Sequence, residues 1–172
     1  MFEIRPEIES DHEAIYSLHL SAFDGRFESE LVDKIRASDN FIPELSRVAI
    51  NNSNVVGHIL LSTIAIKKGG EETPALALAP VAVLPEFQNR GIGSALVKDA
   101  LDEARRLKHQ IVVVIGHPPY YPRFGFVTAK KAGLSAPFDV PDEAFMVCEL
   151  APDALKGVSG MVQYPPEFDE DQ

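Results

Sequence analysis

The chain has 172 residues, of which 45% are apolar, and a formal net charge of −10. This length and composition predict one folded domain over residues 1–172, with an acidic, frayed tail at 167–172. The negative charge disfavours nucleic acid and anionic membranes as partners, because both attract basic surfaces. One cysteine, Cys148, excludes an intrachain disulfide. With no signal-peptide core and no apolar run long enough to span a membrane, we expect a cytoplasmic protein.

Two helices are expected early in the chain, after a short strand at residues 2–5. Ser10 or Asp11 is suited to cap the first helix, and apolar residues then recur with helical spacing to about Ala22. A second apolar stripe, over residues 27–35, predicts the next helix.

Three strands follow, and the last contains a proline. Residues 47–50 and 55–66 favour a hairpin with a short asparagine-rich turn, and the polar residues 67–73 predict a loop. The apolar run 75–84 suits a strand that is buried on both faces. Because Pro80 cannot donate a ladder hydrogen bond, we expect a bulge or a local parting of the sheet there.

The second half of the chain alternates helix and strand. Residues 93–107 carry a strong amphipathic helix pattern, and residues 111–115 read as a short buried strand. Residues 116–126 contain three prolines and leave room for one helical turn, while residues 144–150 predict a late strand. This order predicts an α/β fold with a mixed α+β sheet flanked by helices.

A candidate anion site lies in residues 81–94, where a buried strand gives way to a helix. Gly91 and Gly93 leave the backbone open to a ligand, and the first amides of a helix are unpaired at the positive end of its dipole. Arg90 adds a positive charge beside them. The two glycines could be present merely to allow a tight turn between strand and helix. The buried strand before them and the amphipathic helix after them favour a pyrophosphate site instead. Leu96 stands where a dinucleotide fingerprint needs its third glycine, which excludes that motif.

Two stretches resemble the GNAT acetyltransferases. The run Val83-x-Pro85-x-x-Gln88-x-x-Gly91-x-Gly93 resembles the family's motif A, which binds the pyrophosphate of acetyl-CoA. The run from Tyr121 through Gly125 to Phe126 resembles the family's Tyr-x-x-x-Gly-Phe element. Within the family, the chain is most similar to YhbS-type predicted acetyltransferases, over residues 28–168. The resemblance implies a central twisted sheet, mostly antiparallel, with one splayed parallel pair.

The resemblance also implies an activity and a co-substrate. The expected protein is an N-acetyltransferase that moves an acetyl group from acetyl-CoA, without a metal, to a primary amine of a small molecule or peptide. The amine would attack directly in a ternary complex. The residues expected to bind acetyl-CoA are Val81, Ala82, Val83, Gln88, Asn89, Arg90, Gly91, Ile92, Gly93 and Ser94.

Tyr121 is the expected catalytic residue, because it precedes Gly125 by four positions, as the family's general-acid tyrosine does. A phenol can protonate a departing thiolate, and Tyr120 is the competing candidate. By analogy with the family, the backbone amide of Val83 polarises the thioester carbonyl. The general base stays open between a water chain and the side chains of Glu28, Glu30, His58 and His117.

Several alternatives remain open from the sequence. The chain could be a GNAT-fold module that binds CoA and regulates without turnover, or a transferase for a longer acyl group, and it could be a monomer or a homodimer. Cys148 has the apolar neighbours of a buried, unreactive thiol. The acceptor pocket is expected between the first helices, the loop at 67–73 and the loop at 116–124.

Overall fold

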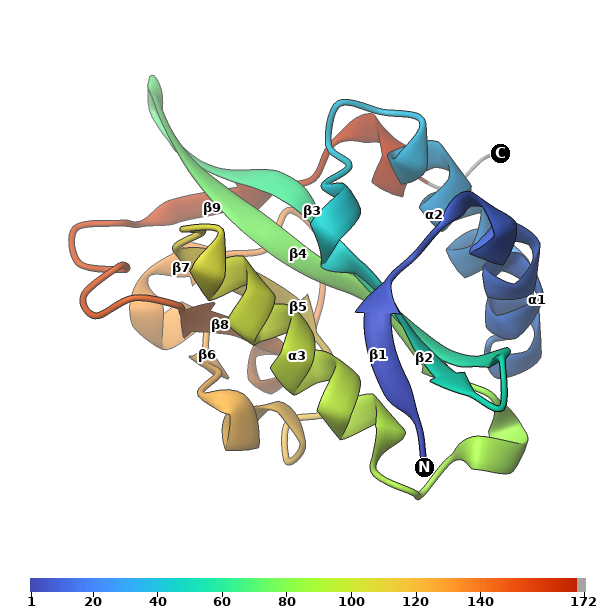
Figure 1. Cartoon of the computed structure of the whole chain (residues 1–172). Coiled ribbons are helices and arrows are strands. Elements are labelled where there is room, and N and C mark those ends of the chain that lie inside the picture. The colour runs from blue at the N-terminus through green and yellow to red at the C-terminus, as the bar shows by residue number, and fades with distance from the viewer. Residues whose placement is uncertain (170–172) are drawn as a thin grey trace.

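The computed structural model describes residues 1–169 as one mixed sheet with helices on both faces (Figure 1). The strand order is β1-β2-β3-β4-β5-β8-β6, with β9 paired to β3 and β7 paired to β9. The strands are β1 (Glu3–Pro6), β2 (Ser46–Asn51), β3 (Asn54–Lys68), β4 (Glu71–Val83), β5 (Ile111–Ile115), β6 (Val127–Thr128), β7 (Leu134–Ser135), β8 (Phe145–Glu149) and β9 (Gly160–Gln163). The helices are α1 (His12–Ala22), α2 (Phe27–Arg36) and α3 (Ile92–Arg106). The predicted fold class is confirmed: most strand pairs are antiparallel, and β4 and β5 run parallel, as do the short strands β7 and β9.

Side-chain alternation along β3 divides the core between two layers. Leu60 packs with residues of α1 and α2, while Ile59 and Leu61 pack with residues of α3. Because neighbouring residues of a strand point to opposite faces, α3 covers one face of the sheet and α1 with α2 covers the other. Figure 1 shows this separation.

The hairpin between β3 and β4 extends further than the sequence predicts. Residues 67–73 are not a loop, because β3 continues to Lys68 and β4 begins at Glu71. Only Gly69 and Gly70 turn the chain, and β9 pairs with β3 at Ala65–Lys67. The polar side chains therefore mark solvent-exposed strand ends, so the prediction of a loop was wrong.

A distortion of β4 occurs at the predicted place. Ile59 pairs with Val81 and Leu61 with Leu78, so Ala79 and Pro80 both stand opposite one residue of β3. A bulge of this kind bends a strand and disrupts its ladder.

On its other edge, β4 pairs with β5 at only two positions, Leu76 with Val112 and Ala77 with Val113. Beyond Ala77 the two strands part, which opens the sheet near the start of α3.

The C-terminal segment packs against the rest of the chain through residue 169. Glu167 and Phe168 lie in a 3₁₀ turn (Pro166–Phe168), and the amide of Asn40 donates to Glu167 Oε1 at 2.7 Å. The first part of the segment that was expected to be frayed therefore makes contact with the rest of the chain, and the fraying stays a prediction. Residues 170–172 lie outside the described residues.

Candidate functional site

A cavity of about 590 Å³ lies beside the end of β4, between the start of α3 and the loop that follows β5. Its lining combines the two motifs that the sequence singled out. The lining residues are Ala22, Phe23, Val81, Ala82, Val83, Gln88, Asn89, Gly93, Val97, Gly116, His117, Tyr120 and Tyr121. Ala22, the last residue of α1, and Phe23 after it belong to the first-helix region that was expected to border the acceptor pocket, although no local sequence motif marks these two residues.

The start of α3 is open to a ligand at both glycines. Gly91 precedes the helix with φ of +82°, a conformation that favours glycine, and nothing lies within 4 Å of where its Cβ would be. A Cβ at Gly93 would meet only Val83 Cγ2 at 3.7 Å and Tyr120 Oη at 3.9 Å. The first amides of α3 are therefore accessible at the positive end of the helix dipole, as a pyrophosphate site requires.

The other expected cofactor-binding residues divide into two groups. Val81, Ala82, Val83, Gln88, Asn89 and Gly93 line the cavity, whereas Arg90, Gly91, Ile92 and Ser94 do not. The guanidinium of Arg90 lies 5.1 Å from the ring centroid of Phe87, and the side chain of Ile92 is buried in the core. Ile92 can therefore contribute only its backbone.

The backbone of Val83 faces the cavity side of β4. The amide of Leu84 donates to Val56 O of β3 at 2.9 Å, and successive residues of a strand direct their polar groups to opposite edges. The polar groups of Val83 therefore point away from β3, toward the parted strands. In agreement, Gln88 Nε2 donates to Val83 O at 3.1 Å.

The adjacent tyrosines have different environments. The hydroxyl of Tyr120 is hydrogen-bonded to Ser94 Oγ at 2.8 Å. The Tyr121 side chain is only 7% exposed, and its ring packs so closely on Gly116 that a Cβ there would lie 2.3 Å from Cε2. Burial, with a smaller contribution from Tyr120, raises the pKa of Tyr121 to about 12, so its hydroxyl keeps its proton at neutral pH.

The candidate bases are scattered. Only His117 lines the cavity, while Glu28, Glu30 and His58 do not. Glu28 Oε1 is buried with no hydrogen-bond partner among residues 1–169. Cys148 is buried, away from the cavity, and burial raises the pKa of its thiol, as expected for an unreactive cysteine.

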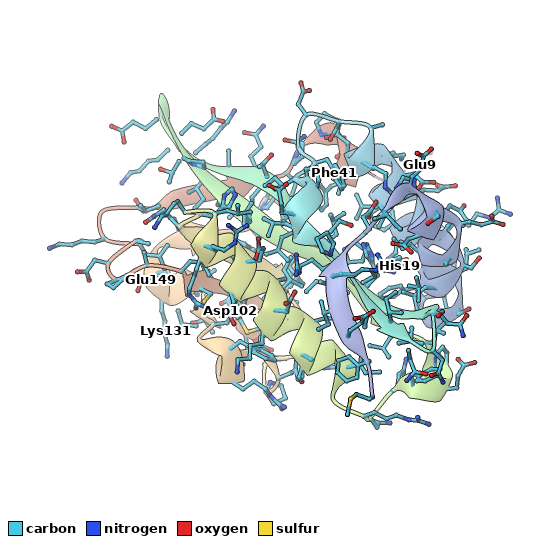
Figure 2. All side chains as sticks on the ribbon, viewed as in Figure 1. Glu9, His19, Phe41, Asp102, Lys131 and Glu149 are labelled. Atoms are coloured by element: carbon cyan, nitrogen blue, oxygen red, sulfur yellow. The ribbon has the colours of Figure 1, made fainter. Side chains whose placement is uncertain are left out.

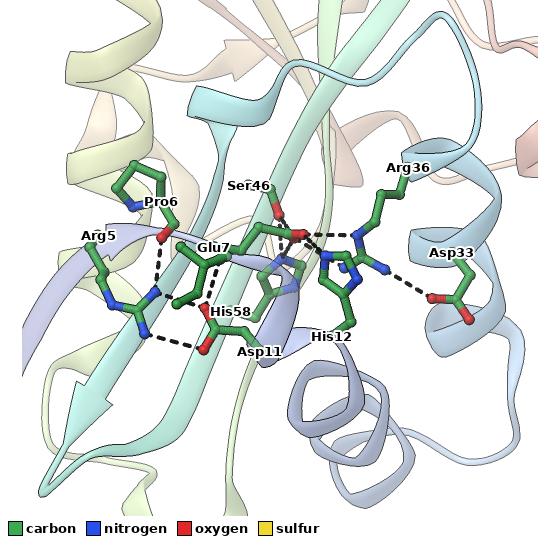
Figure 3. A network of polar contacts seen from close by, with 10 residues as sticks. Arg5, Pro6, Glu7, Asp11, His12, Asp33, Arg36, Ser46 and His58 are labelled. Carbon is green, nitrogen blue, oxygen red and sulfur yellow. Dashed lines mark hydrogen bonds and ion pairs between the residues drawn. The ribbon is translucent and has the colours of Figure 1, made fainter.

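His58 belongs to a buried polar network centred on Glu7 (Figure 3). The carboxylate of Glu7 contacts Arg36 Nε at 2.8 Å and His12 Nε2 at 2.9 Å, and it accepts a short hydrogen bond from Ser46. Burial alone would raise the pKa of Glu7, but the nearby ring of His58 and hydrogen bonds from Arg36 and Ser46 outweigh it and lower the pKa to about 2.

The ionised carboxylate of Glu7 accepts hydrogen bonds only, and this fixes which group donates in each hydrogen bond of the network. Ser46 donates to Glu7, so Ser46 Oγ accepts from His58 Nε2 at 2.9 Å, and His58 Nδ1 accepts from His19 Nε2 at 2.8 Å. His19 Nδ1 is then an unprotonated acceptor, and it has no partner among residues 1–169. Figure 2 labels His19, which belongs to α1. Its contact with His58 therefore joins α1 to β3. Both rings make their hydrogen bonds within this buried network, and His58 does not line the cavity. His58 is therefore not a base that contacts the cavity directly.

Within residues 1–169, no group of three or more His, Cys, Asp or Glu side chains is placed to hold a metal ion. No helix in this part of the chain is both long and apolar enough to cross a membrane.

The expected acceptor region is only partly assembled. The loop at 116–124 borders the cavity and the end of α1 joins it, but none of residues 67–73 lines it. Those residues form the far end of the β3–β4 hairpin. The place where the acceptor binds stays a prediction.

Comparisons with known proteins agree with this geometry. The family model "Acetyltransferase (GNAT) domain" matches residues 3–129. The uncharacterized N-acetyltransferase YjhQ of Escherichia coli K12 is 38% identical over 136 residues, which are 78% of this chain and 75% of YjhQ. The uncharacterized N-acetyltransferase YhbS of the same strain is 34% identical over 166 residues, 96% of this chain and 97% of YhbS.

Two solved structures extend the comparison. The crystal structure of E. coli YhbS in complex with CoA superposes with a TM-score of 0.90 at 32% identity, covering 97% of this chain and 91% of that one. A GNAT acetyltransferase from Brucella melitensis in complex with acetyl-CoA gives a TM-score of 0.80 at 30% identity, covering 98% and 99%. The glycine-rich start of α3, the parted strands and the match over most of the sequence lead to one conclusion: this chain belongs to the GNAT acetyltransferase family.

Proposed function

We propose that this protein is an acetyl-CoA-dependent N-acetyltransferase that acetylates a primary amine by direct attack in a ternary complex. The observation that carries the proposal is the single cavity that joins the open start of α3, the free edge of β4 and Tyr121. The bound CoA and acetyl-CoA of the two similar structures support the choice of co-substrate.

The residues that would hold the co-substrate follow from this cavity. The first amides of α3, next to Gly91 and Gly93, would bind the pyrophosphate, and Arg90 would add charge from outside. The free edge of β4 at Val81–Val83 would hydrogen-bond the pantetheine arm. The amide of Val83 would polarise the thioester carbonyl, because it points toward the parted strands.

Acyl transfer then needs two proton movements. The neutral amine forms a bond to the carbonyl carbon, the carbon–sulfur bond breaks, and the sulfur leaves with the bonding electron pair. Tyr121 is the proposed donor of a proton to that sulfur, because its hydroxyl is protonated at neutral pH. The nitrogen gives up its proton to a base, for which His117 is the candidate that lines the cavity.

Ligand binding and turnover together test the proposal. Acetyl-CoA at 100 times its dissociation constant should stabilise the fold by about 2.7 kcal/mol, whereas NAD should give no comparable shift in melting temperature. Thiol release with a panel of primary amines should then identify a substrate. Binding without thiol release from any amine would favour a CoA-binding regulatory module, and no binding would refute the proposal. The cytoplasmic location, the single domain and the monomeric or dimeric state remain predictions.

A further inference from the structure

A second cavity, of about 450 Å³, adjoins the first along both parted strands. Ala77–Ala79 of β4 and Val113–Ile115 of β5 line the second cavity, while Val81–Val83 and Gly116–His117 line the first. The two cavities therefore follow one another at the point where β4 and β5 separate, after the pair of Ala77 with Val113. A ligand in the second cavity would reach a thioester in the first through this opening.

The walls of the second cavity are mainly aromatic and aliphatic. The rings of Phe138 and Tyr164 stack with centroids 5.8 Å apart, and those of Tyr164 and Phe168 lie 5.0 Å apart at 55°. Phe27, at the start of α2, also lines the cavity. Such apolar enclosure with few polar groups is typical of a small-molecule site, and the volume is in the usual range.

Part of this apolar surface is exposed to solvent. The Phe138 side chain is 50% exposed and Ile115 is 42% exposed, and both line the cavity. Covering them with an apolar group would be favourable, because burial of apolar surface is the main source of binding energy in such a site.

The charge of the lining selects among ligands. Asp169 is the one charged side chain among the lining residues, and neither Lys nor Arg is included in the described part of the lining. An anionic ligand would gain no partner here, whereas an amine that approaches as a cation is attracted by Asp169 and by the faces of the aromatic rings.

We propose that the second cavity binds the acceptor, and that the acceptor is a small monoamine whose body is apolar and of aromatic size. The body would lie against Phe138, Tyr164 and Phe168, with its amine directed to the opening between β4 and β5. This inference rests on the proposed function and names the substrate class of the same site.

The experiment compares amines that differ in their bodies. The rate of thiol release from acetyl-CoA is measured with 2-phenylethylamine, ethanolamine and a blocked lysine peptide. We expect kcat/KM for 2-phenylethylamine to exceed that for ethanolamine by at least tenfold, because one buried aromatic contact is worth about 1.4 kcal/mol, or a factor of ten. Equal values for the three amines, or a preference for the peptide, would overturn the substrate class while leaving the proposed function intact.

A matched pair of variants tests whether the preference for 2-phenylethylamine arises in the second cavity. Phe138→Ala should raise KM for 2-phenylethylamine about tenfold with little change for ethanolamine, and it should fold because the side chain is half exposed. Val127→Ala is the control, since Val127 is 51% exposed but lies outside the cavity. Equal effects of Phe138→Ala on both amines would contradict the proposal.

Two further measurements decide the remaining outcomes. If octanoyl-CoA were the better donor and Phe138→Ala restored the preference for acetyl-CoA, the cavity would hold an acyl chain and the proposal would be wrong. If no amine released thiol, calorimetry with CoA-saturated protein would still test binding of 2-phenylethylamine. Failure to bind at millimolar concentration would overturn the substrate class, whereas failure of acetyl-CoA itself to bind would refute the proposed function first.

Discussion

The hydroxyl of Tyr120 is hydrogen-bonded to the hydroxyl of Ser94, 2.8 Å away in the first turn of α3. This contact links the loop after β5 to the helix start that is proposed to hold the pyrophosphate. It also distinguishes two adjacent tyrosines, because Tyr120 is bound to α3 while the ring of Tyr121 turns to pack on Gly116. The contact therefore favours Tyr121 as the proton donor.

Replacement of Tyr121 by Phe should lower kcat and kcat/KM together and leave the affinity for acetyl-CoA nearly unchanged. The hydroxyl acts only as the carbon–sulfur bond breaks, and general-acid assistance is worth about 100- to 10,000-fold. Steady-state kinetics with an identified amine, together with a binding measurement, would check this. Tyr120→Phe is the control and should have the smaller effect on kcat. A silent Tyr121→Phe beside a damaging Tyr120→Phe would reverse the assignment.

Gly116→Ala should reduce turnover by displacing the ring of Tyr121. An added Cβ would lie 2.3 Å from Cε2 of that ring, so the ring must shift, and overpacking of this kind costs about 1–3 kcal/mol of stability. If both changes act through the Tyr121 hydroxyl, Gly116→Ala should cause little further loss of kcat in a Tyr121→Phe background. Gly70→Ala, where nothing lies within 4 Å of the new Cβ, should leave kcat unchanged. Additive losses in the double variant would show that Gly116 acts by another route.

Gly93→Val should weaken acetyl-CoA binding, while Gly93→Ala should retain most of it. The alanine Cβ makes only ordinary contacts with Val83 and Tyr120, whereas the two valine methyl groups extend into the space beside the first amides of α3. Calorimetry with CoA and thermal unfolding would separate binding from folding.

Gly91 is less suitable for this test, because a substitution there would affect folding as well as binding. Its φ of +82° makes any other side chain costly to the fold, by about 1–2 kcal/mol. Loss of affinity in Gly91→Val would thus mix strain with blockage of the site. A folded Gly93→Val protein that binds CoA as tightly as the parent would place the pyrophosphate elsewhere.

The buried network predicts loss of stability in mild acid. Burial, and next the neighbouring His58, lower the pKa of His19 from 6.5 to about 3. Between these values the unfolded chain binds a proton that the folded protein excludes, so the free energy of unfolding falls as the pH falls from about 6.5. Glu7, with its pKa lowered from 4.5 to about 2, adds a further loss below pH 4.5.

Urea unfolding between pH 7 and pH 4 would measure this dependence. One excluded proton contributes a slope of up to about 1.4 kcal/mol per pH unit. His19→Gln keeps a donor for His58 Nδ1 and does not titrate, so it should remove most of the contribution of His19. An unchanged slope in that variant would show that other groups govern the acid sensitivity.

The sequence alone determined the features that depend on local pattern. The strand over 111–115 and the helix near 93–107 follow from apolar periodicity, and the distortion at Pro80 follows from its missing amide hydrogen. The glycines before α3 and the run from Tyr121 to Phe126 were recognisable because spacing along the chain carries their resemblance to the family. The short strands β6, β7 and β9 were missed, because two to four residues contain too little periodicity to identify a strand.

Only the tertiary structure decided which distant residues meet. Ala22 and Phe23 join the first cavity because α1 packs across the sheet from α3, and the aromatic wall of the second forms from segments far apart in sequence. The same packing buried His58 beside His19 and Glu7 and brought His117 to the cavity instead. The burial of a side chain and its distance from other side chains depend on contacts between segments far apart in the sequence. A local sequence pattern carries no information about such contacts.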